Sequence, residues 1–280
     1  MIAVYAVLKK LEGKIILAPT QITVLAILQG LTEFLPISSS GHLVLMPIVL
    51  GWKDQGLTID IAVHIGTLGA VVLYLRRETW MILSGLGKIV VGKYDEGAKL
   101  AGLLLIASIP VFIAGIAVRV LIGDGIRIPS VIGWAFIIGG ILLYISDRFG
   151  TRIRKTSGLT ILDALLIGIA QAFAIIPGAS RAGTTITMAR LLGYERTDAA
   201  RISLLMSIPA IAGAGSVLSL GIVNNGNPDL ILNVFLGTIV AFITAILAIS
   251  IMMNWIKRRS FTPFVVYRIA LGFLILFLLS

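Results

Sequence analysis

The stretch "QGLTEFLPISSSGH", Gln29 to His42, interrupts an apolar segment of the chain with an acid, a proline, three serines and a histidine. Apolar residues surround it from about residue 22 to residue 50. An ionisable side chain such as Glu33 is costly within an apolar membrane segment and marks a functional site by default. The rest of the chain must therefore explain what this polar break does.

The composition is that of an integral membrane protein. Of the 280 residues, 58% are hydrophobic and 13% are charged, whereas soluble domains carry roughly 25% charged residues. The absence of cysteine excludes disulfides, thiol nucleophiles and thiolate metal sites. The net charge of +10 comes from short Lys and Arg clusters between apolar runs. Such clusters are typical of cytoplasmic loops, so we expect a membrane and no nucleic acid as partner.

Helices should cross the membrane several times. A spanning helix requires about 20 mostly apolar residues, and six segments meet or approach this length: Ile59 to Leu75, Leu100 to Ile122, Ser130 to Ser146, Ile202 to Val223, Leu230 to Met253 and Phe264 to Leu279. Two further apolar regions are interrupted, one from Ile22 to Leu50 and the other from Leu159 to Gly193. The sequence predicts an all-α polytopic membrane protein.

The two interrupted regions resemble each other. Gly41 and Gly183 each follow a Pro-led turn that contains serine, and Ser39 and Ser180 each lie three residues after the proline. Three spanning segments follow each region. This shared order indicates an internal duplication, with an extension at residues 1–20, a first repeat at 21–146 and a second repeat at 159–280 of one membrane domain.

The placement of Lys and Arg predicts the orientation. Threading six spans brings the three most basic connections to one face, which should be cytoplasmic. The first interrupted region then begins and ends outside, and the second begins and ends inside. Two re-entrant helical hairpins from opposite faces are typical of an inverted repeat, with a site where the breaks meet. We expect this site near the outer side of the plasma membrane.

The first break contains an acid, a histidine and several hydroxyls. Gln29 and Glu33 are four residues apart and share one face of a helix. A helix that begins after Pro36 would attract phosphate or carboxylate to its N-terminus, and His42 would stand nearby as an acid, base or nucleophile. The hydroxyls that would line this N-terminus are those of Ser38, Ser39 and Ser40.

The second break, "PGASRAGTT", adds a cation. Arg181 carries a permanent charge on a fork that suits phosphate oxygens. Ser180, Thr184 and Thr185 add hydroxyl donors, and Gly183 allows the backbone to approach a ligand closely. Together the two breaks predict a site for a phosphorylated group.

Structural roles compete with this interpretation. Ser and Gly are common where membrane helices pack closely, and Glu33 with Arg181 would also make a buried salt bridge between the repeats. His64 is expected to pack between helices or support the site rather than catalyse. Arg268 is expected to snorkel or to pair structurally.

The two motifs resemble the signature motifs of the undecaprenyl-diphosphate phosphatase family, also called the bacitracin-resistance (BacA-type) family. The stretches "HIGTLGAVV", "SIPAIAGAG" and "PFVVYRIALG" extend the resemblance over nearly the whole chain from about Ile22. The resemblance implies a membrane hydrolase that removes one phosphate from a polyprenyl diphosphate. Its product, the monophosphate, would return as the lipid carrier for cell-envelope glycans.

The resemblance also assigns roles. It makes Glu33, Ser39, His42 and Arg181 the candidate catalytic residues, with Ser39, His42 or an activated water as the nucleophile. A divalent cation such as Mg²⁺ or Ca²⁺ is the candidate cofactor, with Glu33 as its candidate ligand. The family's serine after the arginine is Ala182 here, which removes a hydroxyl. The candidate substrate-binding residues are Gln29, Ser38, Ser40, Ser180, Gly183, Thr184 and Thr185.

A second class of function is transport. Inverted repeats with broken helices are typical of secondary transporters, so the chain would alternatively flip a polyprenyl phosphate across the bilayer. Release of phosphate by purified protein separates the two classes. The prenyl length stays open, and so does the oligomeric state, for which a homodimer is one option.

Overall fold

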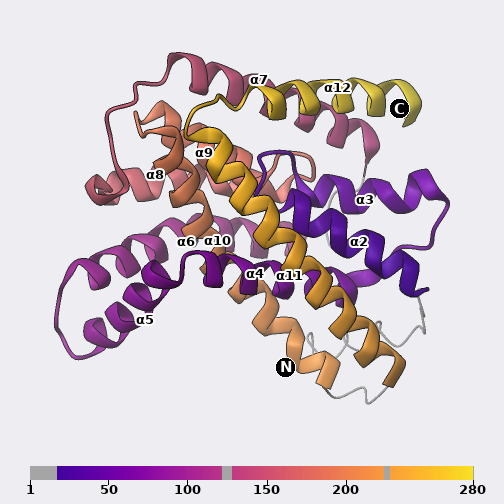
Figure 1. The fold of residues 1–280 in the computed structure, drawn as a ribbon, viewed down its shortest axis with the longest axis horizontal. Helices are drawn as coiled ribbons and strands as arrows, with labels where there is room; N and C mark the ends of the chain where they lie inside the picture. Colours follow the sequence, from indigo (N-terminus) through magenta and orange to yellow (C-terminus); the bar gives the residue numbers. More distant parts are fainter. Residues whose placement is uncertain (1–17, 122–127, 224–227, 280) are drawn as a thin grey trace.

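The computed structural model describes residues 18–121, 128–223 and 228–279, so the predicted extension at 1–20 lies almost entirely outside the described residues. The described residues form helices and no strand, apart from an isolated parallel bridge between Arg154 and Tyr194. The first half contains α2 (Pro19–Thr32), α3 (Ser39–Leu50), α4 (Gly56–Tyr74), α5 (Arg76–Val90), α6 (Glu96–Leu121) and α7 (Pro129–Phe149) (Figure 1). The second half contains η1 (Thr156–Gly158), α8 (Ile161–Ala172), η2 (Phe173–Ile175), α9 (Arg181–Leu191), α10 (Arg196–Val223), α11 (Pro228–Ile256) and α12 (Thr262–Leu279).

Several of these helices are long and apolar enough to cross a membrane. Among the described residues, four qualify by length and composition, within α6, α7, α11 and α12. A fifth span is counted if α4 and α5, which bend by 95° where they join, are taken together. The sixth predicted segment, Ile202 to Val223, lies within α10. The prediction of an all-helical, multi-pass membrane protein is confirmed, whereas the count of six spans stays a prediction.

Both interrupted regions fold as helical hairpins. α2 and α3 are joined by the break at residues 33–38, and α8 with η2 is joined to α9 by the break at 176–180. Ser38 and Ser180 are the only non-glycine residues in the described ranges with positive φ, and both have a φ of 71°. Each serine caps the helix that follows, since its Oγ accepts the N–H of Gly41 or Gly183. The two breaks therefore share one turn geometry.

This geometry corrects the predicted correspondence of the serines. Counting from the prolines matched Ser39 with Ser180, but the conformation and the capping bond match Ser38 with Ser180. Ser39 and Arg181 then take the same position, as the first residue of α3 and of α9. The matched glycines, Gly41 and Gly183, are not affected.

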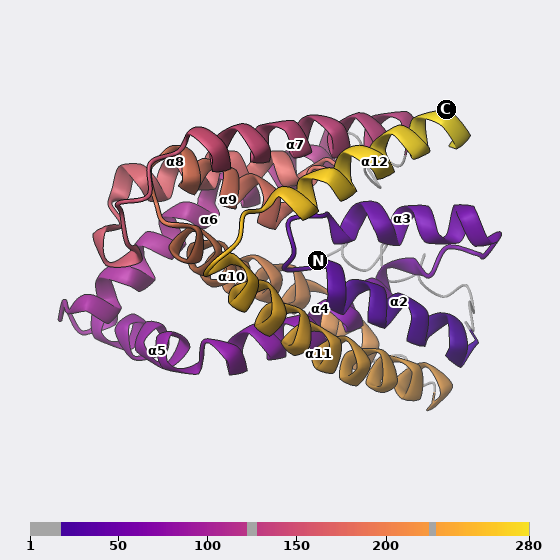
Figure 2. The same ribbon diagram turned by 45° about the horizontal axis from the view of Figure 1, so that its top comes forward.

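Small residues bring the helices close together around the hairpins. α11 packs against α2 and α4, and α12 packs against α7; α7 and α12 run side by side in both views (Figures 1 and 2). A Cβ on Gly30 of α2 would lie 1.8 Å from Thr244 Oγ1 of α11, and one on Gly66 of α4 would lie 2.2 Å from Thr238 O. Replacing Gly30 would push α11 away from α2 in the first hairpin, and replacing Gly66 would push it away from α4.

A buried polar cluster joins the end of α7 to α9, α10 and α12. The fully buried guanidinium of Arg190 lies 3.3 Å from Asp147 Oδ1, which also accepts a hydrogen bond of 2.7 Å from Arg196 Nε. Asp147 Oδ2 accepts the backbone N–H of Phe261 at 3.1 Å. Nearby, burial and the carboxylate of Asp163 raise the pKa of Tyr194 above its ordinary value. This cluster fixes the base of the second hairpin.

Candidate active site

The two breaks touch each other. Ser38 Oγ accepts a hydrogen bond of 3.2 Å from the backbone N–H of Gly178 in the second break. A Cβ on Gly41 would lie 3.2 Å from Gly178 Cα and 2.5 Å from the ring of Phe136 on α7. Only glycine permits this approach, so the first turns of α3 and α9 lie together.

Glu33 and Arg181 form an ion pair across this contact. Arg181 Nη2 lies 2.7 Å from Glu33 Oε1, and the guanidinium lies 6.0 Å from the centre of the Phe34 ring. Glu33 is 6% exposed, so the pair is largely removed from solvent. A buried carboxylate needs such a partner, because an isolated buried charge is strongly unfavourable.

The second oxygen of Glu33 collects further polar groups. Glu33 Oε2 accepts hydrogen bonds from Ser39 Oγ at 2.5 Å and from Gln29 Nε2 at 2.8 Å. His64 Nε2 of α4 lies 3.6 Å from the same oxygen. His64 Nδ1 is 2.5 Å from the carbonyl of Asp60, which can only accept. Nε2 is thus the ring nitrogen that faces the carboxylate, and His64 borders the site.

His42 lies beside this cluster with both ring nitrogens engaged. Its Nδ1 is 2.6 Å from the carbonyl of Ser38, so Nδ1 carries the proton and Nε2 accepts in the neutral ring. Nε2 is 2.6 Å from the hydroxyl of Tyr267 on α12, and the two rings stack with centroids 5.7 Å apart and planes 8° apart. His42 is 8% exposed, whereas Tyr267 is 44% exposed.

Arg268 holds the two breaks from behind. Its fully buried guanidinium donates to the carbonyls of Pro36 at 3.3 Å in the first break and of Gly178 and Ala179 at 3.0 and 2.9 Å in the second. It also donates to two carbonyls of α7, those of Ala135 and Phe136. Of the two roles expected for Arg268, snorkelling is wrong and a structural role is confirmed, because the guanidinium satisfies backbone carbonyls inside the protein. The absence of Cβ on Gly183 makes room for it, since that atom would lie 2.4 Å from Arg268 Nη1.

The hydroxyl-bearing residues predicted for the site, together with Arg181, divide into two groups. Ser38, Ser180 and Thr185 are buried, and their hydroxyls bond within the protein; Thr185 Oγ1 donates to Ser203 Oγ at 2.8 Å. These three shape the turns rather than open toward a ligand. The residues that are half-buried at the junction, and thus accessible to a ligand, are Ser39, Ser40, Arg181 and Thr184.

Two buried polar atoms at the junction lack a partner. Within the described part of the chain, neither Arg181 Nη1 nor Gln29 Oε1 has a hydrogen-bond partner. Buried polar groups are nearly always satisfied, so an unpartnered guanidinium nitrogen beside two helix N-termini calls for an anionic ligand. An unpartnered amide oxygen calls for a donor or a cation.

The residues at the junction of the breaks would supply only part of the coordination shell of a divalent cation. No three His, Asp or Glu side chains in the described ranges cluster in a way that holds a metal ion. Glu33 and Gln29 Oε1 supply oxygen ligands of the kind that Mg²⁺ and Ca²⁺ prefer. The set suits a cation whose shell is completed by water and by phosphate oxygens of a substrate.

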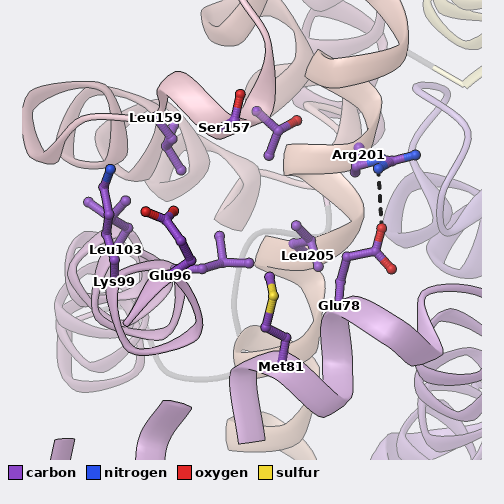
Figure 3. A pocket seen from close by; sticks show the side chains of 11 residues that line it. Glu78, Met81, Glu96, Lys99, Leu103, Ser157, Leu159, Arg201 and Leu205 are labelled. Carbon is purple, nitrogen blue, oxygen red and sulfur yellow. Dashed lines mark ion pairs between the residues drawn. The ribbon is translucent and has the colours of Figure 1, made fainter. Parts of the chain in front are cut away.

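A hollow of about 220 Å³ lies elsewhere, between α5, α6, η1 and α10. Leu100, Leu103 and Leu205 line it, and at its edge Arg201 pairs with Glu78 at 3.2 Å (Figure 3). Neither break reaches this hollow. The polar groups suited to phosphate chemistry are those at the junction of the breaks.

Fold and site together define a helical multi-pass membrane protein with a buried centre suited to an anionic group. The family model described as "Bacitracin resistance protein BacA" matches residues 22–274. The chain belongs to this family. It is 47% identical over 253 residues to an undecaprenyl-diphosphatase of Dinoroseobacter shibae and 46% identical over 253 residues to one of Ruegeria pomeroyi, covering 90% of this chain and 95% of each relative. It is 42% identical to an undecaprenyl-diphosphatase 1 of Rhodospirillum rubrum, covering 90% of this chain and 92% of the relative.

The sequence reasoning missed two contributors to the site, Tyr267 and Ser203. Tyr267 lies within "PFVVYRIALG", a stretch quoted for the family resemblance, but nothing in its spacing indicates contact with His42. The contact joins residues separated by 225 positions. Ser203 lies in an apolar helix, where a single hydroxyl carries no signal of its own.

Proposed function

We propose that this protein is a membrane phosphatase that hydrolyses a polyprenyl diphosphate, undecaprenyl diphosphate in the named relatives, to the monophosphate and phosphate. It would thereby recycle the lipid carrier for cell-envelope glycan synthesis. The observation that carries the proposal is the cluster of Ser39, Glu33 and Arg181, in which a hydroxyl contacts a carboxylate beside an unpartnered guanidinium nitrogen.

Ser39 is the nucleophile in this proposal, since its Oγ lies 2.5 Å from Glu33 Oε2. Ser39 Oγ attacks the terminal phosphorus, and its proton moves to Glu33. The bond from that phosphorus to the bridging oxygen breaks, and the departing polyprenyl monophosphate takes the proton. Water then attacks the phosphoserine and gives its proton to Glu33, which returns it to Ser39 Oγ as phosphate leaves.

Arg181 and the N-termini of α3 and α9 stabilise the charge on the transferred group. Arg181 Nη1 is free to donate to a phosphate oxygen, and the first turn of each helix presents backbone N–H groups to an anion. Glu33 and Gln29 are the residues that would hold a divalent cation. When bound, such a cation would neutralise phosphate charge.

His42 and Tyr267 form a supporting pair. The carbonyl of Ser38 fixes the tautomer of His42, and the Tyr267 hydroxyl fixes the direction of Nε2. Tyr267 acts in this proposal as a positioning residue that keeps His42 ready to donate or accept a proton at the site.

The prenyl chain would lie in an apolar hollow of about 240 Å³ between α7, α8 and α9. Leu142, Ile169, Phe173 and Met188 line this hollow, which begins beside Gly183 and Thr184 in the first turn of α9. An isoprenoid chain is apolar throughout and fits such a lining. Its diphosphate would then reach the junction of the breaks.

We further propose the finer architecture of six spans and two re-entrant hairpins, as an inverted repeat of residues 21–146 and 159–280. The shared turn geometry of Ser38 and Ser180 supports the repeat. α2 and α3 extend toward one end of the molecule, while α8 lies toward the other (Figure 2). With the basic connections in the cytoplasm, the first hairpin opens outward and the site faces the outer side.

Phosphate release by purified protein tests the proposal. Wild type should release phosphate from polyprenyl diphosphate in detergent, and Arg181→Lys should lower kcat/KM by on the order of 10²-fold or more, because the fork is lost. Arg201→Lys, at an exposed ion pair away from the breaks, is the matched control. The relatives described above carry the name of a phosphatase and give no support to transport. Transbilayer movement in liposomes without phosphate release would favour the transport alternative.

A further inference from the structure

α5 turns sharply away from the membrane spans. The axes of α4 and α5 differ by 95°, with the bend at Leu75. α5 then crosses the very beginning of α6, since a Cβ on Gly85 would lie 2.3 Å from the carbonyl carbon of Gly97. α5 therefore lies across the end of the predicted span Ile59 to Leu75 and beside the start of α6.

The two apolar faces of α5 have different surroundings. Thr79, Ile82 and Gly85 are buried against the neighbouring helices. Trp80, Leu83 and Val90 lie outside this buried face and are 73%, 56% and 85% exposed. Because successive residues turn by about 100° in a helix, these three side chains fall in one stripe along the outer face.

A polar edge runs beside this stripe. Arg77, Ser84 and Lys88 follow one another at spacings of seven and four, about a quarter turn from the line of Trp80 and Leu83. A helix with an apolar stripe, a tryptophan and a basic edge is typical of an element that lies in the headgroup layer. The stripe would enter the upper part of the acyl chains, and the edge would face the headgroups.

The charges around α5 are predominantly unpaired cations. Arg76, Arg77 and Lys93 form no ion pair within the described residues. Two of the three neighbouring acids, Glu78 and Asp95, are engaged, and residues 76–99 contain five Lys and Arg against three Asp and Glu. Glu78 pairs with Arg201, and Asp95 accepts a hydrogen bond of 2.5 Å from Lys88, which lowers the pKa of Asp95 below its ordinary value. The surface formed by α5 and its flanking loop therefore carries a net positive charge.

We propose that α5 is a membrane-surface element that binds the headgroups of anionic phospholipids. A positive surface attracts such lipids within a Debye length, and the exposed stripe anchors the helix among them. α5 lies at one end of the molecule, and the open ends of α2 and α3 lie at the other (Figures 1 and 2). By the placement of basic residues, the leaflet is the cytoplasmic one. This surface is independent of the proposed phosphatase site.

The depth of α5 can be measured directly because the chain has no cysteine. A single Leu83→Cys variant carries a fluorophore on the apolar stripe, and Ser157→Cys places the same probe on the exposed η1 segment nearby. In vesicles of phosphatidylcholine and phosphatidylglycerol, lipids brominated in the upper acyl chain should quench the probe at residue 83 at least about threefold more than the probe at 157. Equal quenching at the two positions would overturn the proposal.

The preference for anionic lipid needs a charge variant with a matched control. The variant Arg76→Gln, Arg77→Gln and Lys93→Gln removes three charges from the α5 surface, and Lys257→Gln, Arg258→Gln and Arg259→Gln removes three from the α11–α12 connection. We expect the α5 variant to lose at least about tenfold in phosphatidylglycerol affinity, since each charge contributes up to about fivefold. The control variant should keep most of it. The probe on residue 83 shows that the variant still inserts, and equal loss in both variants, or none in either, contradicts the proposal.

Discussion

Replacing Ser39 distinguishes a mechanism in which the protein attacks phosphorus from one in which water attacks it. Because its hydroxyl lies 2.5 Å from Glu33 Oε2, Ser39→Ala should lower kcat by on the order of 10³-fold or more. Ser157→Ala, on the exposed η1 segment away from both breaks, is the control and should keep most of the activity. Acid quenching of the wild type with radiolabelled substrate should yield phosphoserine. A phosphohistidine, or full activity in Ser39→Ala, would reject Ser39 as the nucleophile.

Tyr267 contacts His42 through its hydroxyl and its stacked ring, so it is a sensitive test of positioning. Tyr267→Phe removes one hydroxyl and keeps the stacked ring. A hydrogen bond contributes about 0.5–1.5 kcal/mol net, so we expect kcat to fall about three- to tenfold with little change in KM.

The pH–rate profile checks this role. Loss of the Tyr267 hydroxyl should move the limb that reports His42, whereas Tyr144→Phe, an exposed tyrosine on α7, should leave it in place. An unchanged profile in Tyr267→Phe would mean that the hydroxyl only stabilises the packing of α12.

The turns that begin α3 and α9 contain both a correct prediction and a wrong one. Their existence was predicted correctly, whereas the correspondence of their serines was not. Pro, Ser and Gly inside apolar runs predicted two broken hairpins, because these residues interrupt a helix for reasons local to the chain. The match between Ser39 and Ser180 failed because φ depends on the packed turn, which leaves Ser38 and Ser180 in the left-handed region.

The strain in these turns gives a stability prediction. Ser180→Ala removes the cap and keeps the unfavourable φ of 71°, so it should lower the free energy of unfolding by about 1 kcal/mol. Ser180→Gly loses the same cap but relieves about 1 kcal/mol of backbone strain. Thermal unfolding in detergent should therefore rank wild type and Ser180→Gly together, above Ser180→Ala. The reverse order of the two variants would show that the positive φ carries no strain.

α5 was not predicted as a separate element, for a physical reason. Residues 76–90 carry Arg76, Arg77, Glu78 and Lys88 among their apolar residues, so the segment falls below the hydrophobicity of a span and the sequence predicts part of a basic connection there. The 95° bend at Leu75 depends on packing against α6, which the local sequence does not encode.

At the scale of the whole molecule, α12 joins parts that are far apart in the chain. Arg268 donates to carbonyls of both breaks and of α7, and sequence could not predict this because backbone carbonyls leave no pattern. The pairing of Glu33 with Arg181 was predictable, because a buried acid and a buried base in two similar breaks require each other.

The hub formed by Arg268 should be intolerant of substitution. Arg268→Lys retains the charge but cannot reach five carbonyls, which leaves buried acceptors unsatisfied. We expect the free energy of unfolding to fall by about 2–4 kcal/mol and phosphate release to fall with it. Arg148→Lys, on the exposed end of α7, is the control and should melt with the wild type. A melting temperature of Arg268→Lys equal to that of the wild type would remove Arg268 as the link between the breaks.

The central claim is that the junction of the two breaks performs phosphatase chemistry with Glu33 as its base. The most direct measurement is phosphate release from polyprenyl diphosphate by purified wild type and by Glu33→Gln, matched in thermal stability and in membrane extraction. The account predicts steady release by the wild type and a loss on the order of 10³-fold in Glu33→Gln. Comparable release by the two proteins, or none by the wild type, would contradict it.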